Sequence, residues 1–348
     1  VMQGTAIPLL TRILKIGRHL MAETSVSDID VNGVTLRVHQ AGDPANPTVV
    51  LCHGFPELGY SWRHQMVPLA DAGFHVIAPD QRGYGHSSAP PEIVAYGIGA
   101  LTDDLLALLD HFGKADATFV GHDWGALIVW DLARLHPHRV RSVVGVSVPF
   151  VQWPAPPTQL MQMLYGDRFF YILYFQTPTI AETELDADPY DSMAKVMWGA
   201  SGVGFGGRDR TRELPPMEGT GFLTMMPEPP ARPFVGPEGP WLTEEDLQIY
   251  ADEFANSGFF GPVSYYRNLD ANYEIIKELG PERLTMPVYF IGGTDDVVNV
   301  MDPTGIERMQ NLLPNFRGSI VLDGVGHWTQ QEAPAAFNDA LLGFLRSP

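Results

Sequence analysis

A carboxylate lies between two glycines in the stretch GHDWG, where Asp123 has Gly121 and Gly125 two positions to either side. It follows the apolar run ATFV and precedes WGALIVWDLA, a pattern typical of a strand, a tight turn and a helix. Small neighbours permit a turn that lifts one side chain above a sheet, and the N–H groups that open the helix favour an anion there. The pattern predicts a nucleophilic carboxylate. The alternative is that Asp123 only caps the helix.

His327 is the candidate general base. Ten of the 11 histidines lie at or before His138, and only His327 lies beyond it. It stands in LDGVGHWTQQ, between a strand-like run and a helix-like run, where a loop would place it over the edge of a sheet. Because a nucleophile at such a turn works with a base from another loop, we interpret His327 as that base.

A carboxylate that orients His327 is expected after the preceding strand-like run, PVYFIGG. Two candidates follow this run, Asp295 and Asp296. The residue types and their spacing leave both of them open.

Backbone donors for an oxyanion hole are expected at two turns. The stretch LCHGFPE places His53 and Gly54 after a buried strand-like run, so the next turn can present the N–H of Phe55. The N–H of Trp124, directly after the elbow carboxylate, can join it. We interpret His53 itself as a hydrogen-bonded structural residue and not as a second base.

Several motifs occur together in the order of one family. They are HGFPE, DQRGYGHSSAPPE, GHDWGA, YILYFQ, YYRN and GHW. In these motifs the chain resembles the soluble-type epoxide hydrolases of the α/β-hydrolase fold. The resemblance covers most of residues 28–347, but neither the first twenty residues nor a Gly- and Pro-rich stretch described below.

The resemblance implies two further site residues. In the family, two tyrosines of a cap domain donate hydrogen bonds to the epoxide oxygen. The matching positions are Tyr171, the first tyrosine of YILYFQ, and Tyr266, the tyrosine of the YRN run. The alternative is that both tyrosines only belong to the aromatic core of the cap.

The same resemblance favours one of the two acids. Counting from Tyr266, the orienting acid of the family falls at Asp296 and not at Asp295. Comparison with related hydrolases also predicts a cis Phe55–Pro56 peptide, and X–Pro bonds adopt the cis form at a cost of only about 0.5–1 kcal/mol.

The chemistry explains why an acid replaces the serine of other hydrolases with this turn. An epoxide offers no carbonyl carbon, only a strained sp³ carbon with an alkoxide as leaving group. A carboxylate can attack that carbon, and the product is an ester whose carbonyl belongs to the enzyme. Water activated by His327 can then hydrolyse the ester and release a vicinal diol. The resemblance thus implies a hydrolase acting on ether bonds that uses a covalent aspartyl ester.

Two other functions remain as alternatives. Haloalkane and haloacid dehalogenases also use an elbow aspartate, but they stabilise a halide with Trp or Asn donors and need no pair of cap tyrosines. A non-catalytic binding protein of the same fold would keep a pocket without chemistry. A serine esterase is disfavoured because no serine occupies the elbow.

The elements that must position these residues form a sheet domain in two parts, 23–149 and 278–348. In both parts continuous apolar strands alternate with helical runs, which predicts a mainly parallel sheet covered on both faces, as in the α/β-hydrolase fold. The chain between them, 150–277, is rich in Tyr, Phe, Met and Pro and predicts an inserted, mostly helical cap. Within it, 199–240 holds 9 Gly and 8 Pro, which predicts a long loop.

Residues 1–22 are interpreted as an N-terminal extension. Residues 7–20 have apolar residues at helical spacing, but Arg12, Lys15 and Arg18 interrupt them. The stretch is therefore neither a signal peptide nor a spanning helix, and we predict a short amphipathic helix.

Composition limits the partners. The chain has 348 residues, of which 45% are apolar and 18% charged, as in folded globular proteins. A net charge of −19 argues against nucleic acid and against an anionic membrane surface. The single cysteine, Cys52, excludes an intrachain disulfide and fits the cytoplasm. We expect no cofactor and no metal. The expected partners are a small apolar epoxide and water, without a membrane span, and a homodimer is possible.

Overall fold

The computed structural model describes residues 23–206, 213–232 and 234–346. They contain an eight-stranded sheet with the order β1-β2-β4-β3-β5-β6-β9-β10. The pairs β1–β2 and β2–β4 are antiparallel and the others are parallel. The strands are β1 (Thr24–Val31), β2 (Val34–Ala41), β3 (Thr48–Cys52), β4 (His75–Pro79), β5 (Ala117–His122), β6 (Val140–Val146), β9 (Val288–Gly293) and β10 (Phe316–Leu322).

The central strands are apolar because both faces of the sheet are covered. Successive residues of a strand point to opposite faces, so Val49 packs in one apolar cluster and Val50 in another. Helices α1 (Arg63–Asp71) and α15 (Pro334–Leu345) share the cluster of Val49, whereas α2 (Ile98–His111) and α3 (Trp124–Leu135) share that of Val50. The predicted doubly covered, mainly parallel sheet is confirmed.

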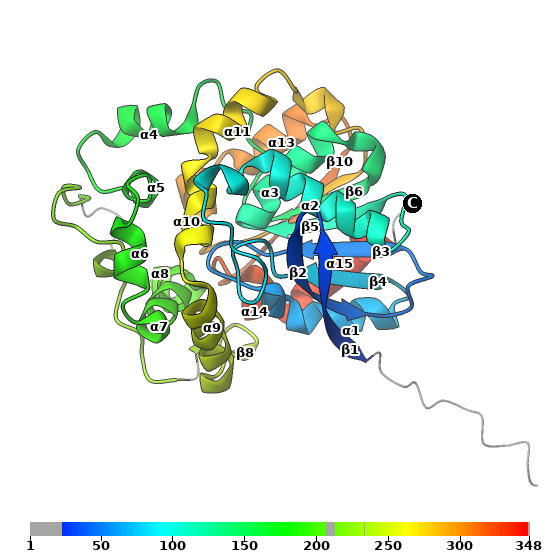
Figure 1. Ribbon diagram of the computed structural model, residues 1–348, viewed down its shortest axis with the longest axis horizontal. Coiled ribbons are helices and arrows are strands. Elements are labelled where there is room, and N and C mark those ends of the chain that lie inside the picture. Colours follow the sequence, from blue (N-terminus) through cyan, green and yellow to red (C-terminus); the bar gives the residue numbers. More distant parts are fainter. Residues whose placement is uncertain (1–22, 207–212, 233, 347–348) are drawn as a thin grey trace, which may run out of the picture.

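The chain between β6 and β9, called the insertion below, is mostly helical. Figure 1 shows it in green to yellow, to the left of the sheet. Its elements are α4 (Pro157–Tyr165), α5 (Tyr171–Tyr174), α6 (Ile180–Leu185), α7 (Pro189–Ala200), α8 (Gly202–Gly206), η4 (Leu223–Met225), β7 (Phe234–Gly236), β8 (Gly239–Leu242), α9 (Glu244–Ser257), α10 (Phe260–Arg267), α11 (Leu269–Ile276) and η5 (Pro281–Arg283). The remaining short helices are η1 (Gly59–Trp62), η2 (Ile93–Tyr96), η3 (Pro137–Arg139), α12 (Val297–Met301), α13 (Gly305–Leu312) and α14 (Thr329–Glu332).

The prediction of one long loop over 199–240 is wrong, because the stretch holds regular elements, among them the short helix η4. The short helix α8 lies in it, and β7 and β8 pair as an antiparallel hairpin. Close backbone contact explains the glycines of α8, because a Cβ on Gly202 would lie 2.4 Å from the carbonyl oxygen of Gly324. Gly202 thus lets the insertion pack against the loop that carries His327, whose N–H donates to the carbonyl of Ala200 at 2.9 Å.

The amphipathic helix predicted over residues 7–20 lies outside the described residues. Within the described part of the chain, no helix is long and apolar enough to cross a membrane.

Candidate active site

Asp123 lies at the turn between β5 and α3, at the carboxyl end of the sheet's parallel strands. Its backbone has φ 51° and ψ −117°. A positive φ is uncommon for a residue other than glycine, and such strain occurs where the surrounding structure holds one side chain in a required place.

Two glycines make this turn sterically possible. A Cβ on Gly121 would lie 2.1 Å from the carbonyl oxygen of Gly125, and a Cβ on Gly125 would lie 2.1 Å from that of Cys52. Real Cβ atoms do not approach backbone this closely, so both positions need glycine. The GxDxG spacing is therefore a packing requirement of the elbow.

The contacts of Asp123 do not support the capping alternative. Asp123 occupies the N-cap position of α3, but its side chain makes no capping hydrogen bond. Its Oδ1 accepts a hydrogen bond from the N–H of Phe55 at 2.8 Å, and its Oδ2 lies 3.5 Å from Nε2 of His327. The Phe55–Pro56 peptide is cis, so this prediction is confirmed. The N–H of Trp124 opens α3, and its part in the oxyanion hole stays a prediction.

The loop after β10 brings His327 to the elbow. Its Nδ1 lies 3.0 Å from Oδ1 of Asp296, which also accepts a hydrogen bond from the N–H of Val298 at 2.9 Å. The carboxyl carbon of Asp295 lies instead 3.2 Å from where a Cβ on Gly206 would be. Of the two acids that the spacing leaves open, the structure thus brings Asp296 to His327.

Two carboxylates determine the charge of His327. Burial alone would lower the pKa of its imidazole, but the charges and hydrogen bonds of Asp296 and Asp123 outweigh burial and raise this pKa well above its ordinary value. The two carboxylates therefore favour the protonated form of His327 in the free enzyme.

A second buried pair, Glu57 and His122, lies beneath the elbow and was missed in the sequence. Nδ1 of His122 lies 2.5 Å from Oε2 of Glu57, and both side chains are 0% exposed. Nε2 of His122 lies 2.7 Å from the carbonyl oxygen of His327, which can only accept. Burial alone would raise the pKa of Glu57, but His122 and other donors hold it well below its usual range. Because the carbonyl can only accept, Nε2 of His122 donates to it, and Nδ1 faces Glu57.

This pair joins three segments that are far apart in the sequence. Oε1 of Glu57 accepts hydrogen bonds from Nε2 of Gln330 and of Gln331, both at 2.9 Å. The hydroxyl of Ser147 donates to the carbonyl of His327 at 2.9 Å. The HGFPE turn, the elbow and the histidine loop are therefore held together by one polar network. Glu57 belongs to the motif HGFPE and His122 to the motif GHDWG. Their presence in these two motifs was the only indication in the sequence that they take part in the site.

His53 is a structural residue, as predicted. It is 0% exposed, its Nδ1 lies 2.9 Å from the carbonyl of Gly54, and its Nε2 accepts from the N–H of Gln81 at 3.0 Å. Burial lowers the pKa of its imidazole to about 4. His53 is therefore neutral and holds the turn that carries the Phe55 N–H.

The insertion supplies the two predicted tyrosines. Tyr171 opens α5 and Tyr266 lies in α10, with their ring centroids 5.8 Å apart. Both line the same cavities as Asp123. Burial, and next the charge of Asp123, raise the pKa of each phenol well above its ordinary value. Both hydroxyls therefore stay protonated and can donate across the pH range of ordinary catalysis.

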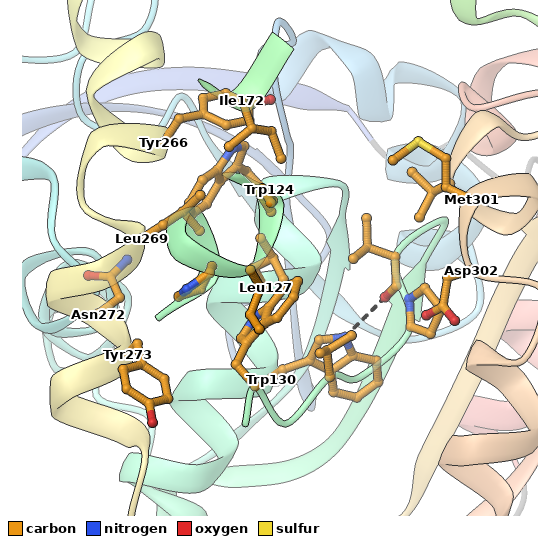
Figure 2. Close-up of a pocket in the computed structure, with 18 of the residues that line it drawn as sticks. Trp124, Leu127, Trp130, Ile172, Tyr266, Leu269, Asn272, Tyr273, Met301 and Asp302 are labelled. Atoms are coloured by element: carbon orange, nitrogen blue, oxygen red, sulfur yellow. Dashed lines mark hydrogen bonds between the residues drawn. The ribbon is translucent and has the colours of Figure 1, made fainter. Parts of the chain in front are cut away.

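Two cavities meet at the elbow. Asp123, Tyr171 and Tyr266 line both of them. We call the larger cavity the long arm. It has a volume of about 410 Å³ and runs between α3 and α11 (Figure 2). We call the smaller cavity the short arm. It has a volume of about 130 Å³ and is lined in part by His327. A substrate with two unequal substituents can therefore place its reactive centre at Asp123.

No described residues form a group of three or more His, Cys, Asp or Glu side chains suited to a metal ion. The polar groups described above are instead arranged for attack by a carboxylate, for proton transfer by an imidazole and for donation by two phenols.

Comparison with known proteins agrees with this geometry. A family model described as alpha/beta hydrolase fold matches residues 47–184. Epoxide hydrolase A of Mycobacterium tuberculosis is 45% identical over 318 residues, which cover 91% of this chain and 96% of that protein. Bifunctional epoxide hydrolase 2 of Sus scrofa is 36% identical over 90% of this chain, and the match spans 54% of that longer protein.

Solved structures show the same similarity. The crystal structure of epoxide hydrolase A from Mycobacterium thermoresistibile superposes with a TM-score of 0.85 at 46% identity, covering 93% of this chain and 99% of the other. An epoxide hydrolase from an endophytic Streptomyces superposes with the same TM-score of 0.85 at 34% identity, covering 92% of this chain and 95% of the other. The predicted fold class is thereby confirmed.

Proposed function

We propose a two-step mechanism for this chain, which belongs to the epoxide hydrolases of the α/β-hydrolase fold and is thus a hydrolase acting on ether bonds. Asp123 is the nucleophile, His327 the base, Asp296 the acid that orients it, and Tyr171 and Tyr266 the proton donors. The observation that carries the proposal is the position of Asp123, whose carboxylate lies between a backbone donor and an imidazole and lines both cavities together with the two phenols.

In the first step a carboxylate oxygen of Asp123 attacks one epoxide carbon. The C–O bond to that carbon breaks, and the oxygen leaves as an alkoxide that takes a proton from Tyr171 or Tyr266. We assign the attack to Oδ2, because the Phe55 N–H holds Oδ1 at 2.8 Å. The product is an ester on Asp123 with Oδ1 as its carbonyl oxygen.

The second step hydrolyses this ester. His327 removes a proton from water, and the resulting hydroxide attacks the ester carbonyl carbon. The negative charge that develops on Oδ1 is stabilised by the Phe55 N–H and by the Trp124 N–H. Collapse of this intermediate passes the proton of the added hydroxyl to the departing oxygen, which releases the vicinal diol and restores the carboxylate. The proton taken from water stays on His327, as in the free enzyme.

Formation of the ester also prepares the base. In the free enzyme His327 lies between two carboxylates that raise the pKa of its imidazole. Esterification of Asp123 removes one of these charges, which lies 3.5 Å from Nε2. The pKa of His327 must then fall, and its proton passes through solvent to the tyrosinate that the first step leaves behind. This transfer gives the neutral imidazole that water activation needs. Ester formation in the first step thus makes His327 able to act as the base in the second step.

The tyrosine pair favours an epoxide over a halide. An alkoxide is strongly basic and leaves only with acid assistance, whereas a halide leaves without a proton. Two phenols with raised pKa values beside the nucleophile suit the alkoxide. The dehalogenase and the non-catalytic alternatives have no comparable support.

Further assignments are proposals of the same kind. Residues 150–277 act as a cap over a core of 23–149 and 278–348. The substrate is a small apolar epoxide, because the residues lining the cavities are mostly apolar. The buried thiol of Cys52 fits a cytoplasmic protein. A homodimer is a hypothesis that sedimentation can test.

Product analysis tests the function directly. The protein is incubated in parallel with styrene oxide and with a bromoalkane, and diol, alcohol and halide are measured. We expect diol from the epoxide and no halide release. Halide release without diol formation would replace the epoxide assignment by the dehalogenase alternative, and no turnover across a broad set of epoxides would support a binding protein.

A further inference from the structure

The long arm of the cavity follows helix α3. Trp124, Leu127, Asp131 and Arg134 line it at spacings of three and four residues, so they form one stripe along the helix. With a rise of 1.5 Å per residue, this stripe extends roughly 15 Å from the elbow. The opposite wall is α11, and the exposed Leu164 of α4 also lines the arm. The arm therefore accepts a substituent much longer than the short arm does.

The charges at the far end of the long arm are balanced. Arg134 pairs with Asp131, and Arg308 pairs with Asp302. These four side chains and Asp123 are the only Asp, Glu, Lys or Arg residues among the described residues that line the arm. The arm therefore holds no excess of positive charge, and a free carboxylate on the substrate would lose its hydration without gaining an unmatched cation.

One neutral donor faces the middle of the arm. Oδ1 of Asn272 accepts a hydrogen bond from the N–H of Ile98 at 2.8 Å. Because that N–H can only donate, the oxygen of the amide is fixed toward it and the nitrogen must point the other way. Asn272 lines the long arm, and Figure 2 shows its nitrogen turned toward the pocket. Within the described part of the chain, Nδ2 makes no hydrogen bond.

The position of the Asn272 amide along the arm defines where a substrate would have to carry a hydrogen-bond acceptor. Asn272 lies in α11, which begins just after α10, the helix that carries Tyr266, and both residues line the long arm. Its amide is held by the start of α2, so little side-chain freedom is lost when it binds a ligand. A donor that faces a mostly apolar arm favours a ligand that carries an acceptor there.

We propose that Asn272 is a specificity-determining residue that selects epoxides whose longer substituent carries a neutral oxygen acceptor, such as an ester, ether or amide oxygen. This inference rests on the proposed function and adds the substrate class. The Nδ2–H of Asn272 donates to this acceptor while the epoxide lies between Asp123 and the two tyrosines. The balanced arginines make the neutral acceptor preferred over a free carboxylate.

Three terminal epoxides of equal chain length test the proposal. One ends in a methyl group, one carries a methyl ester near its far end, and one carries the corresponding free acid. We expect kcat/KM to be highest for the ester. Preference for the free acid would overturn the proposal, because it would require an arginine of the arm to bind the substrate carboxylate in place of its aspartate partner.

The decisive variant is Asn272→Asp, which keeps an oxygen for the Ile98 N–H and replaces the donor by a second acceptor. The ratio of kcat/KM for the ester to that for the methyl-terminated epoxide should fall about 10-fold, as expected for the loss of one buried hydrogen bond. Because both substrates are measured on the same enzyme, a loss of stability cancels in this ratio. Asn272→Ala should lower the ratio as well and serves as the uncharged second variant.

Tyr273→Phe is the matched control. Tyr273 lines the same arm, but Figure 2 shows its hydroxyl directed away from the pocket, so the ratio should stay unchanged. If wild-type protein forms diol from all three epoxides and neither Asn272 variant changes the ratio, the inference is wrong and the proposed function stands. If no diol forms from any of them, the proposed function itself fails.

Discussion

The two halves of the active site are held in place by different interactions. The half on the sheet is fixed by hydrogen bonds, since Asp123, His327 and Asp296 are each bonded to backbone N–H groups or to one another. The half on the insertion is held by aromatic packing, in which Tyr266 lies edge-on to Trp124 and to Phe55, with ring centroids 5.1 and 5.4 Å away.

The two halves also have different roles in the proposed reaction. The bond-forming atoms need fixed positions, and a hydrogen-bonded network on a rigid sheet supplies them. The phenols line both cavities and Asn272 lines the long arm, where their donors can reach the substrate. We therefore expect changes on the sheet half to affect whether the reaction occurs, and changes on the insertion to affect how fast and on which epoxide.

The largest effect is expected from Asp123→Asn. An amide cannot attack the epoxide, so diol formation should fall by at least about 1,000-fold, as for loss of a nucleophile in other enzymes. Freshly prepared protein is assayed for diol, because slow deamidation would restore the acid. An unchanged thermal unfolding curve serves as the folding control. Full activity in the fresh variant would remove Asp123 from the mechanism.

The neighbouring acids provide a matched pair. Asp296→Asn should lower kcat by about 100- to 10,000-fold, because His327 loses the carboxylate that orients it. Asp295→Asn changes the same kind of side chain one residue earlier, outside the catalytic contacts, and should retain most activity. Steady-state diol formation measures both. A larger loss in the Asp295 variant would reverse the assignment.

The insertion half should give smaller, graded losses. Tyr171→Phe or Tyr266→Phe should slow ester formation by about 10- to 1000-fold, the usual contribution of acid assistance, and the double variant should be nearly inactive. Since burial raises the pKa of both phenols, no loss from tyrosine ionisation should occur below about pH 10. Stopped-flow measurement of ester formation against pH checks both points. A wild-type rate in the double variant would make both tyrosines packing residues.

The smallest effect on chemistry is expected from Glu57→Gln, which should act mainly on stability. Loss of one partner of a buried ion pair should lower the free energy of unfolding by about 3 kcal/mol near neutral pH. The pKa of Glu57 is depressed in the folded state, so its contribution is present above the ordinary carboxylate pKa of about 4 and is lost as the pH falls further. Urea unfolding of both proteins should therefore show a difference that shrinks in acid. A difference that stays constant would exclude an ionised Glu57.

Much of the sheet half could be predicted from the sequence because its motifs are local. The elbow, the histidine loop and the cis Phe55–Pro56 turn each depend on a few consecutive residues. The pairing of Glu57 with His122 could not be read in this way, since 65 residues separate them. Packing of distant segments creates that contact, and no spacing rule describes it.

Strand β1 and the role of the glycines after residue 199 could not be predicted either, because both depend on the segments against which they pack. Strand β1 carries Asp28 and Asp30, which are poor strand formers, and it is an edge strand held by pairing with β2. The glycines after residue 199 suggest a loop by composition. In the structure Gly202 instead allows close backbone contact with the loop of His327, which depends on the partner segment.

The two-step mechanism is tested most directly by the mass of the His327→Gln protein after exposure to styrene oxide. Asp123 can still open the epoxide in this variant, but no base activates water, so the ester should accumulate. We predict a protein whose mass has increased by one molecule of substrate, with the addition located on the peptide that contains Asp123. A variant that has consumed the epoxide and yet remains unmodified would contradict the covalent mechanism.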